Sequence, residues 1–246
     1  MAEKKLEGAG LRGQVAGKTS LSTVGKAGKG LTYRGYEIEV LAEKAFFEEV
    51  AYMLLYGNLP NKEEYSSYTN KLKKLRALPN ELKEVLENIP ASAHPMDVMR
   101  TGCSMLGNLE PEGDFKNQNS SADRILASLA SIIVYWYKFS HEGKKVNLET
   151  DYETIGGHFL SLLTDKDPSE DDIRCLDTSL ILYAEHGFNA STFTARTCAS
   201  TLSDIHSCIT GAIGTLRGPL HGGANEAAME MIEQYSSREE AHKAVL

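Results

Sequence analysis

The chain has 246 residues, enough to bury a sizeable core as one large domain or two small ones. Hydrophobic residues make up 41% of the sequence and charged residues 24%, which is ordinary for a soluble globular protein. The formal net charge of −8 argues against nucleic acid as a partner, because a surface that binds phosphates needs an excess of positive charge. An anionic substrate therefore requires a local positive cluster.

Nothing in the sequence is typical of a membrane or secreted protein. The longest apolar run, residues 125–139, is interrupted by serines and is too short to span a bilayer. The first ten residues lack the apolar core of a secretion signal. The cysteines have no close CxxC spacing, so we interpret them as reduced, packed thiols and expect no metal site: Cys103, Cys175, Cys198 and Cys208. These features predict a cytoplasmic protein.

Residues 1–36 form a glycine-rich segment for which we expect a small β-hairpin. Strand-forming residues occupy 19–24 and 30–33, and the intervening KAGKG supplies a turn. The glycines do not match a phosphate-binding loop, because GxxxxGK[ST] is absent from the sequence. The hairpin is therefore interpreted as structural.

Helical patterns dominate residues 37–246, which we treat as a second, helical unit. One helix is expected over 37–56 and another from Asn61 or Lys62 to Ala77. His94-Pro95 opens a later helix, and we interpret His94 as a structural residue near the site. Residues 111–121 read as a polar loop, after which Asp123 is available as a cap. Further helices are expected over 81–88, from 123 to about 142, 156–163 and from 170 to the region before His186.

Two histidines lie beside helix-start signals. After His186-Gly187, the polar run 189–192 offers side-chain oxygens that cap a new helix. Small and apolar residues then recur at three- and four-residue spacing, which predicts one long helix over 191–217.

The second histidine, His221, follows a break at Gly218-Pro219 and precedes two glycines. Glycines allow backbone to approach a ligand closely. The helix expected over 224–235 would point unpaired N–H groups and its positive end at the same place. Such a setting favours an anion or a developing oxyanion, and a neutral histidine that donates to a carbonyl oxygen.

Four motifs resemble the citrate synthase superfamily, and they occur along the chain in the order expected for that family. GPLHGGANE (218–226) is similar to its histidine motif. GLTYRGYEIEVLAE (30–43), SAHPMDVMRTG (92–102) and YAEHGFNASTFTAR (183–196) are similar to its bacterial 2-methylcitrate synthase branch. The resemblance extends from about residue 10 to the end, and it implies an all-α, citrate-synthase-like large helical domain with a small N-terminal β-hairpin.

The resemblance implies an acyltransferase that condenses propionyl-CoA with oxaloacetate and water to give 2-methylcitrate and CoA. His221 would donate a hydrogen bond to the thioester oxygen as enolate charge builds there. His186 would hold oxaloacetate, and Asn189 and Arg196 would shape its pocket. Lys71, in KLKKLR, would also contact substrate, although charge runs of this kind usually face solvent. No metal or redox cofactor is implied, because the thioester itself activates the carbon.

The chain ends at Leu246, and the resemblance implies that further site residues follow in the family. These are a second histidine in a GFGH-like motif, arginines for the substrate carboxylates and an aspartate base. We therefore expect residues 37–246 to hold the helical large domain with the start of the small domain, whereas most of the small domain is missing. Residues 1–246 alone are expected to be inactive. Two alternatives stay open: a citrate synthase that uses acetyl-CoA, and a catalytically inactive helical dimerisation scaffold. The family resemblance also implies a homodimer packed through the central helices, and the small residues and methionines of the helices around 92–107 and 191–217 are compatible with close packing.

Overall fold

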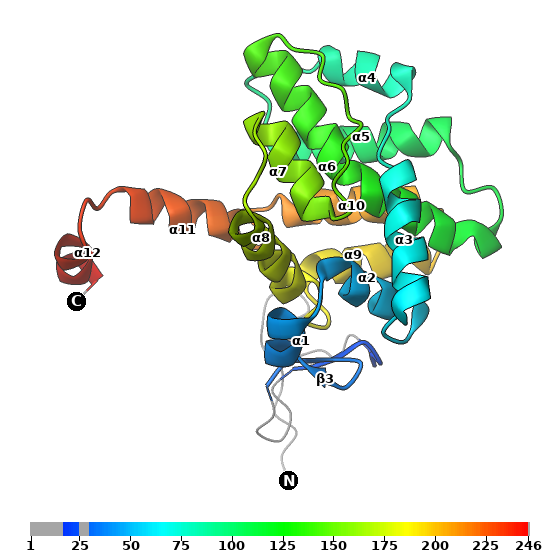
Figure 1. Ribbon diagram of the computed structural model, residues 1–246, viewed down its shortest axis with the longest axis horizontal. Helices are drawn as coiled ribbons and strands as arrows, with labels where there is room; N and C mark the ends of the chain where they lie inside the picture. Colours follow the sequence, from blue (N-terminus) through cyan, green and yellow to red (C-terminus); the bar gives the residue numbers. More distant parts are fainter. Residues whose placement is uncertain (1–16, 25–29, 246) are drawn as a thin grey trace, which may run out of the picture.

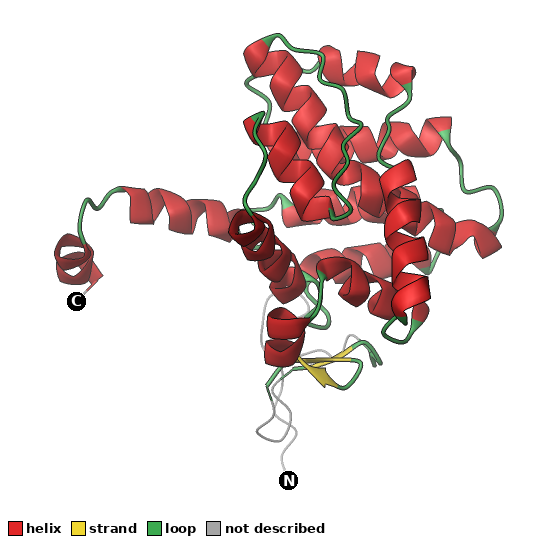
Figure 2. Cartoon of the chain, in the orientation of Figure 1, coloured by secondary structure: helices red, strands yellow, loops and turns green. Residues whose placement is uncertain are grey.

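The computed structural model describes residues 17–24 and 30–245, and helices dominate this part of the chain (Figures 1 and 2). The all-α fold class is confirmed. The strands are β1 (Ser22–Thr23), β2 (Thr32–Tyr33) and β3 (Tyr36–Glu37). The helices are α1 (Ile38–Lys44), α2 (Phe47–Tyr56), α3 (Lys62–Lys74), α4 (Asn80–Glu87), α5 (Pro95–Leu109), η2 (Phe115–Asn117, a 3₁₀ turn), α6 (Gln118–Glu142), α7 (Ile155–Thr164), α8 (Glu170–Tyr183), α9 (Ala190–Ala199), α10 (Ile205–Leu216), α11 (Gly223–Glu233) and α12 (Arg238–Val245).

The N-terminal hairpin is confirmed, and the structure adds a strand to it. β1 and β2 pair antiparallel with Ser22 opposite Tyr33, whereas the predicted turn falls on residues 25–29, outside the described ones. β3 pairs with β2 where the sequence pattern predicted the start of a helix. The buried Tyr33 hydroxyl donates to the Ile181 carbonyl at 2.9 Å. The sheet is thereby attached to the end of α8, close to His186.

The core is organised around α6, which lies among α4, α5 and α7 in Figure 1. Its buried Trp136 and Ile132 pack with side chains of the three surrounding helices. A β-carbon on Gly102 of α5 would lie 2.5 Å from Ile132, so glycine is needed for this close approach of α5 and α6. Among the described residues, no helix is long and apolar enough to cross a membrane.

The helix predicted over 37–56 is wrong in one respect, because it is interrupted at Ala45 and Phe46. Both residues adopt extended backbone dihedrals. Two side chains of α8 bind the backbone groups freed by the break: Arg174 donates to the Ala45 carbonyl at 2.6 Å, and Asp177 accepts from the Phe47 N–H at 2.8 Å. A tertiary contact therefore replaces one turn of helix.

The predicted polar loop over 111–121 and the capping role of Asp123 are also wrong. A 3₁₀ turn forms at 115–117, and α6 already begins at Gln118. Asp123 lies inside α6 and is fully buried. Its carboxylate accepts hydrogen bonds from the Tyr56 and Tyr68 hydroxyls and from the Lys71 ammonium, the last at 2.6 Å. Hydroxyl and ammonium donors of α2 and α3 therefore stabilise a carboxylate within α6.

The single helix predicted over 191–217 is two helices, α9 and α10, that pack against each other. Leu202 adopts a positive φ of 64° at the break. Asp204 then caps α10 by accepting from the Ser207 N–H at 2.9 Å, and the buried Glu112 accepts from the Ile205 N–H at 2.8 Å. The cap and the distant carboxylate together stabilise the second helix start.

Other boundaries agree with the local signals. Asn61 and Ser169 cap α3 and α8 with reciprocal capping boxes, and His94 caps α5. α3 ends at Lys74, three residues before the predicted Ala77. Beyond it, the buried Arg76 donates to the Glu153 carbonyl at 2.8 Å, which ties this extended segment to the loop before α7.

Acid should destabilise the fold through His158, which is fully buried in α7. Its ring nitrogens lie 3.0 Å from the Ser131 and Thr150 hydroxyls, and burial lowers its pKa to about 3. Because the unfolded chain takes up this proton near pH 6.5 and the native state does not, stability is retained above pH 6.5 and lost as pH falls toward 3. The expected slope is about 1.4 kcal/mol per pH unit. Denaturant titrations from pH 7.5 to 5 should show a shallower slope for His158→Gln; equal slopes would contradict this assignment.

Candidate active site

His221 lies in a tight turn between α10 and α11. Its N–H donates to the Gly218 carbonyl at 2.9 Å, and the Gly223 N–H reaches the same oxygen at 3.2 Å. A β-carbon on Gly222 would lie 2.4 Å from the Leu216 carbonyl oxygen. Only glycine therefore allows this turn to pack on the end of α10.

The His221 imidazole contacts the first turn of α9. Its Nε2 lies 2.9 Å from the Ser191 hydroxyl and 3.3 Å from the Ser191 N–H. An amide N–H can only donate, so Nε2 accepts, and the proton of the neutral ring lies on Nδ1. Within the described part of the chain, Nδ1 has no hydrogen-bond partner, so its N–H is available to a ligand carbonyl.

Asn189 connects Ser191 to His186. As the cap of α9, its Oδ1 accepts from the Thr192 N–H and the Ser191 hydroxyl, each at 2.8 Å. Its Nδ2 lies 3.2 Å from His186 Nε2. His186, Asn189, Ser191 and His221 thus form one connected group, in which His221 is held by the Ser191 N–H and the Ser191 hydroxyl donates to Asn189; we call it the histidine relay. The structure brings together three predicted site residues and adds Ser191, for which the sequence predicts only a place in the helix start.

Arg196 lies beside the histidine relay but outside it. Its guanidinium stacks over the Phe188 ring with the central carbon 4.8 Å from the ring centroid. Phe188 follows His186 by two residues, and Arg196 is exposed. The arrangement leaves guanidinium donors at the edge of the segment that carries His186.

Lys71 is not brought to the histidines. It forms an ion pair with the buried Asp123 and remains 43% exposed. None of its polar contacts involves a residue of the histidine relay. The structure gives Lys71 a partner in α6, and its substrate contact stays a prediction.

The expectation about the start of α11 is wrong in detail. The N–H groups of Gly223, Ala224 and Asn225 already donate to carbonyls of the preceding turn, at 3.2 Å in each case. They are therefore not free to bind an anion. Within residues 17–24 and 30–245, no three His, Cys, Asp or Glu side chains are grouped to hold a metal ion.

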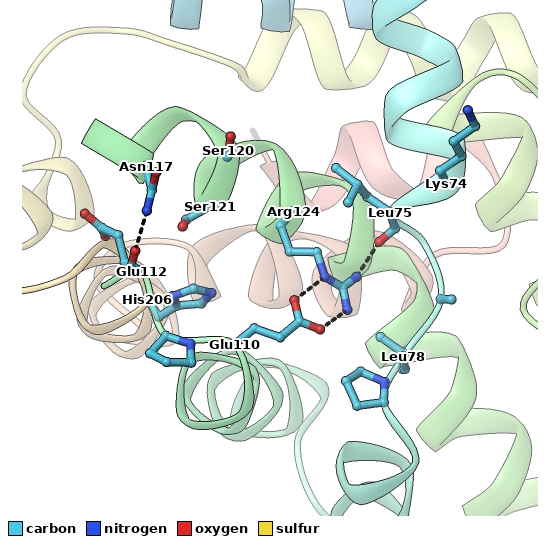
Figure 3. Close-up of a pocket in the computed structure, with 13 residues that line it drawn as sticks. Lys74, Leu75, Leu78, Glu110, Glu112, Asn117, Ser120, Ser121, Arg124 and His206 are labelled. Atoms are coloured by element: carbon cyan, nitrogen blue, oxygen red, sulfur yellow. Dashed lines mark hydrogen bonds and ion pairs between the residues drawn. The ribbon is translucent and has the colours of Figure 1, made fainter. Parts of the chain in front are cut away.

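A cavity of about 620 Å³ lies elsewhere, between the ends of α3 and α5 and the start of α6 (Figure 3). Arg124 crosses it to form a bidentate pair with Glu110, at 2.7 and 2.8 Å, which holds the Glu110 pKa below its usual value. His206 is buried there, its pKa is lowered by burial, and neither ring nitrogen forms a hydrogen bond with a described residue or reaches solvent, although Nδ1 lies 3.9 Å from Asp204. Arg124 and Glu110 are paired with each other and none of the five predicted site residues lines this cavity, so we assign it no part in the reaction.

Comparison with known proteins defines the class. The family described as "Citrate synthase, C-terminal domain" matches residues 10–246. The chain therefore belongs to the citrate synthase family. It is 64% identical over 243 residues to the 2-methylcitrate synthase of Shewanella oneidensis, covering 99% of this chain and 65% of that protein.

More distant relatives carry both names. The 2-methylcitrate synthase 1 of Corynebacterium glutamicum is 41% identical over 91% of this chain and 60% of that protein. The citrate synthase of Deinococcus radiodurans is 37% identical over 94% of this chain and 62% of that protein. The chain thus spans less than two thirds of the length of these curated relatives.

Solved structures agree with the fold. The Thermotoga maritima citrate synthase superposes with a TM-score of 0.82 and 35% identity, covering 96% of this chain and 63% of that one. The Thermoplasma acidophilum citrate synthase, described as a ternary complex with carboxymethyl coenzyme A and oxaloacetate, gives 0.84 and 27% identity. That match covers 92% of this chain and 60% of the other.

Proposed function

We propose that the complete protein carrying this chain condenses propionyl-CoA with oxaloacetate and water, yielding 2-methylcitrate and free CoA. A carbon–carbon bond forms between C2 of the propionyl group and the ketone carbon of oxaloacetate. Water then cleaves the thioester and CoA leaves as the thiol. A thioester already acidifies the neighbouring C–H, so the proposal includes no metal or redox cofactor.

The observation that supports this proposal most strongly is the histidine relay. It presents one histidine with a free Nδ1–H and a second histidine fixed by the same cap residue. The 64% identical Shewanella protein is named a 2-methylcitrate synthase. The Thermoplasma structure is described as a complex with carboxymethyl coenzyme A and oxaloacetate. A coenzyme A derivative and oxaloacetate are the two kinds of ligand that the proposed reaction needs.

In this proposal, His221 stabilises the enolate. Its Nδ1–H donates to the thioester oxygen, where negative charge builds as the C2 proton leaves. The Ser191 N–H fixes the tautomer by donating to Nε2. Family resemblance implies an aspartate as the base that removes this proton.

His186 holds the oxaloacetate in the same proposal. Asn189 orients the His186 ring, and Arg196 offers its guanidinium to a substrate carboxylate, for which its planar donors are suited. A contribution from Lys71 would require its ammonium to leave Asp123, at 2.6 Å in this structure. We therefore expect substitution of Lys71 to lower the stability of the fold more than it weakens substrate binding.

The proposal is tested by the rate of CoA release from oxaloacetate with propionyl-CoA and with acetyl-CoA, using the complete protein. A higher kcat/KM with propionyl-CoA supports it, and a higher value with acetyl-CoA favours citrate synthase. One methylene in an apolar pocket separates such substrates by only ~1–3 kcal/mol, so measurable rates with both are expected. No release with either thioester favours the inactive dimerisation scaffold.

Ser191→Ala should lower kcat roughly tenfold, about the contribution of one hydrogen bond, with little effect on the KM for oxaloacetate. The variant removes the hydroxyl that donates to Asn189 and lies 2.9 Å from His221 Nε2, and it keeps the backbone N–H. Thr197→Ala is the matched control, because its hydroxyl donates only to the Phe193 carbonyl of the same helix. Equal kcat values for the two variants would show that the hydroxyl does not support His221.

We also propose a homodimer in the cytoplasm. Exposed apolar side chains on α8 and α11 favour a covering partner: Leu182, Tyr183, Met229, Met231 and Ile232. The described cysteines are all free, as suits a reducing compartment. Light scattering of the complete protein would give the mass of the assembly.

A further inference from the structure

Helix α11 leaves the body of the molecule almost unsupported. In Figure 1 it extends away from the other helices, with α12 at its far end. Every residue from Ala224 to Glu233 is exposed. The direction of α11 therefore depends on its first turn, which directly follows the turn that carries His221.

Within residues 30–245, two side chains of α11 form hydrogen bonds with other helices. Glu226 accepts from His94 Nε2 at 3.1 Å, at the start of α5. Asn225 donates to the Tyr183 hydroxyl at 3.4 Å, at the end of α8. The first turn is thus held between two helices of the body.

The tautomer of His94 shows which group donates in the contact with Glu226. His94 Nδ1 accepts from the Met96 N–H at 3.1 Å, so Nε2 carries the proton. That proton points to a carboxylate oxygen of Glu226, which makes the hydrogen bond charge-assisted. An acidic residue in the first turn also complements the positive end of α11.

The contact lies close to the candidate catalytic histidine. The Ala224 N–H donates to the His221 carbonyl, and Gly222 packs against the Leu216 carbonyl without room for a β-carbon. Residues 218–226 therefore form a continuous hydrogen-bonded segment with no side chain at 222 or 223 to fix it. A change in the direction of α11 would therefore pull on the backbone of His221.

We propose that His94 and Glu226 are positioning residues for His221. Their hydrogen bond fixes the first turn of α11 and keeps the 218–223 turn closed, so that Nε2 of His221 stays against Ser191. The effect on turnover rests on the proposed function, whereas the effect on the backbone does not.

The test compares variants of the complete protein by hydrogen–deuterium exchange of the 218–226 amides and by steady-state kinetics. Glu226→Ala removes the acceptor, and Glu226→Gln keeps one. His94→Asn keeps the cap of α5 but is too short to reach Glu226. Glu230→Ala is the matched control, since Glu230 lies one turn further along α11 and its side chain has no described polar contact with another helix.

Glu226→Ala and His94→Asn should each exchange the 218–226 amides roughly tenfold faster, and the double variant should be no faster than either single one. Their kcat should fall roughly tenfold with an unchanged KM for oxaloacetate, while Glu226→Gln and Glu230→Ala stay near wild type. Unchanged exchange in both anchor variants, or equal acceleration by Glu230→Ala, would overturn the proposal. Accelerated exchange in a protein without condensation activity would support the positioning contact and reject the proposed reaction.

Discussion

The His221→Ala variant of the complete protein should lose about 10²–10³-fold in kcat, because it removes the donor proposed to stabilise the enolate oxygen. The loss should fall mainly on kcat, since the charge that His221 stabilises exists only as the reaction proceeds. CoA-thiol release under saturating substrates measures it. The fold should be retained, because His221 lies in a partly exposed turn.

A second histidine variant serves as the control. His141 lies at the exposed end of α6, where its ring stacks on Tyr137 with centroids 4.7 Å apart. His141→Ala should therefore leave kcat close to wild type. If His221→Ala retained wild-type kcat as well, the role assigned to its Nδ1–H would be rejected.

Asp123→Ala should destabilise the protein by about 1–3 kcal/mol, the cost of leaving the buried Tyr68 hydroxyl without its acceptor. Asp123 is fully buried in α6 and accepts from Tyr68 at 3.0 Å, from Lys71 at 2.6 Å and from Tyr56. Burial, reinforced by this carboxylate, raises the pKa of both tyrosines. Without Asp123, the buried Tyr68 hydroxyl loses its acceptor, whereas Lys71 can turn toward water.

Denaturant unfolding at neutral pH measures this loss, and Asp151→Ala is its control. The Asp151 carboxylate lies on the surface and pairs with Lys73 at 3.6 Å, so its removal should change stability by less than about 1 kcal/mol. A similar small loss for Asp123→Ala would show that the cluster does not hold α2 and α3 to α6. Lys71→Met should also destabilise the protein, because it leaves the buried Asp123 carboxylate without its counter-charge.

The helix starts could be predicted from the sequence because their causes are local. A cap such as Asn61 or Asn189 acts within three residues, and the sequence shows both partners. The break at Ala45 depends instead on Arg174 and Asp177, about 130 residues away. The missed break before α10 had a local signal in Asp204, but its second stabilising contact comes from Glu112, far along the chain.

In the candidate site, too, residues in local motifs could be predicted, whereas contacts between distant segments could not. His186, Asn189 and His221 could be found because each lies in a short motif that resembles the family. Ser191 lay in the same motif, yet its contact with His221 spans 30 residues and requires α9 and the turn after α10 to meet. The link between His94 and Glu226 spans 132 residues, so no local pattern predicts it.

The most direct test of the account is to identify the product formed by the complete protein from oxaloacetate and isotopically labelled propionyl-CoA. Mass spectrometry should detect a labelled tricarboxylate that carries one methyl group more than citrate, together with free CoA. Formation of that product by the wild type and its loss in His221→Ala is the expected result. Thioester cleavage that yields labelled propionate without the tricarboxylate would contradict a condensation at this site.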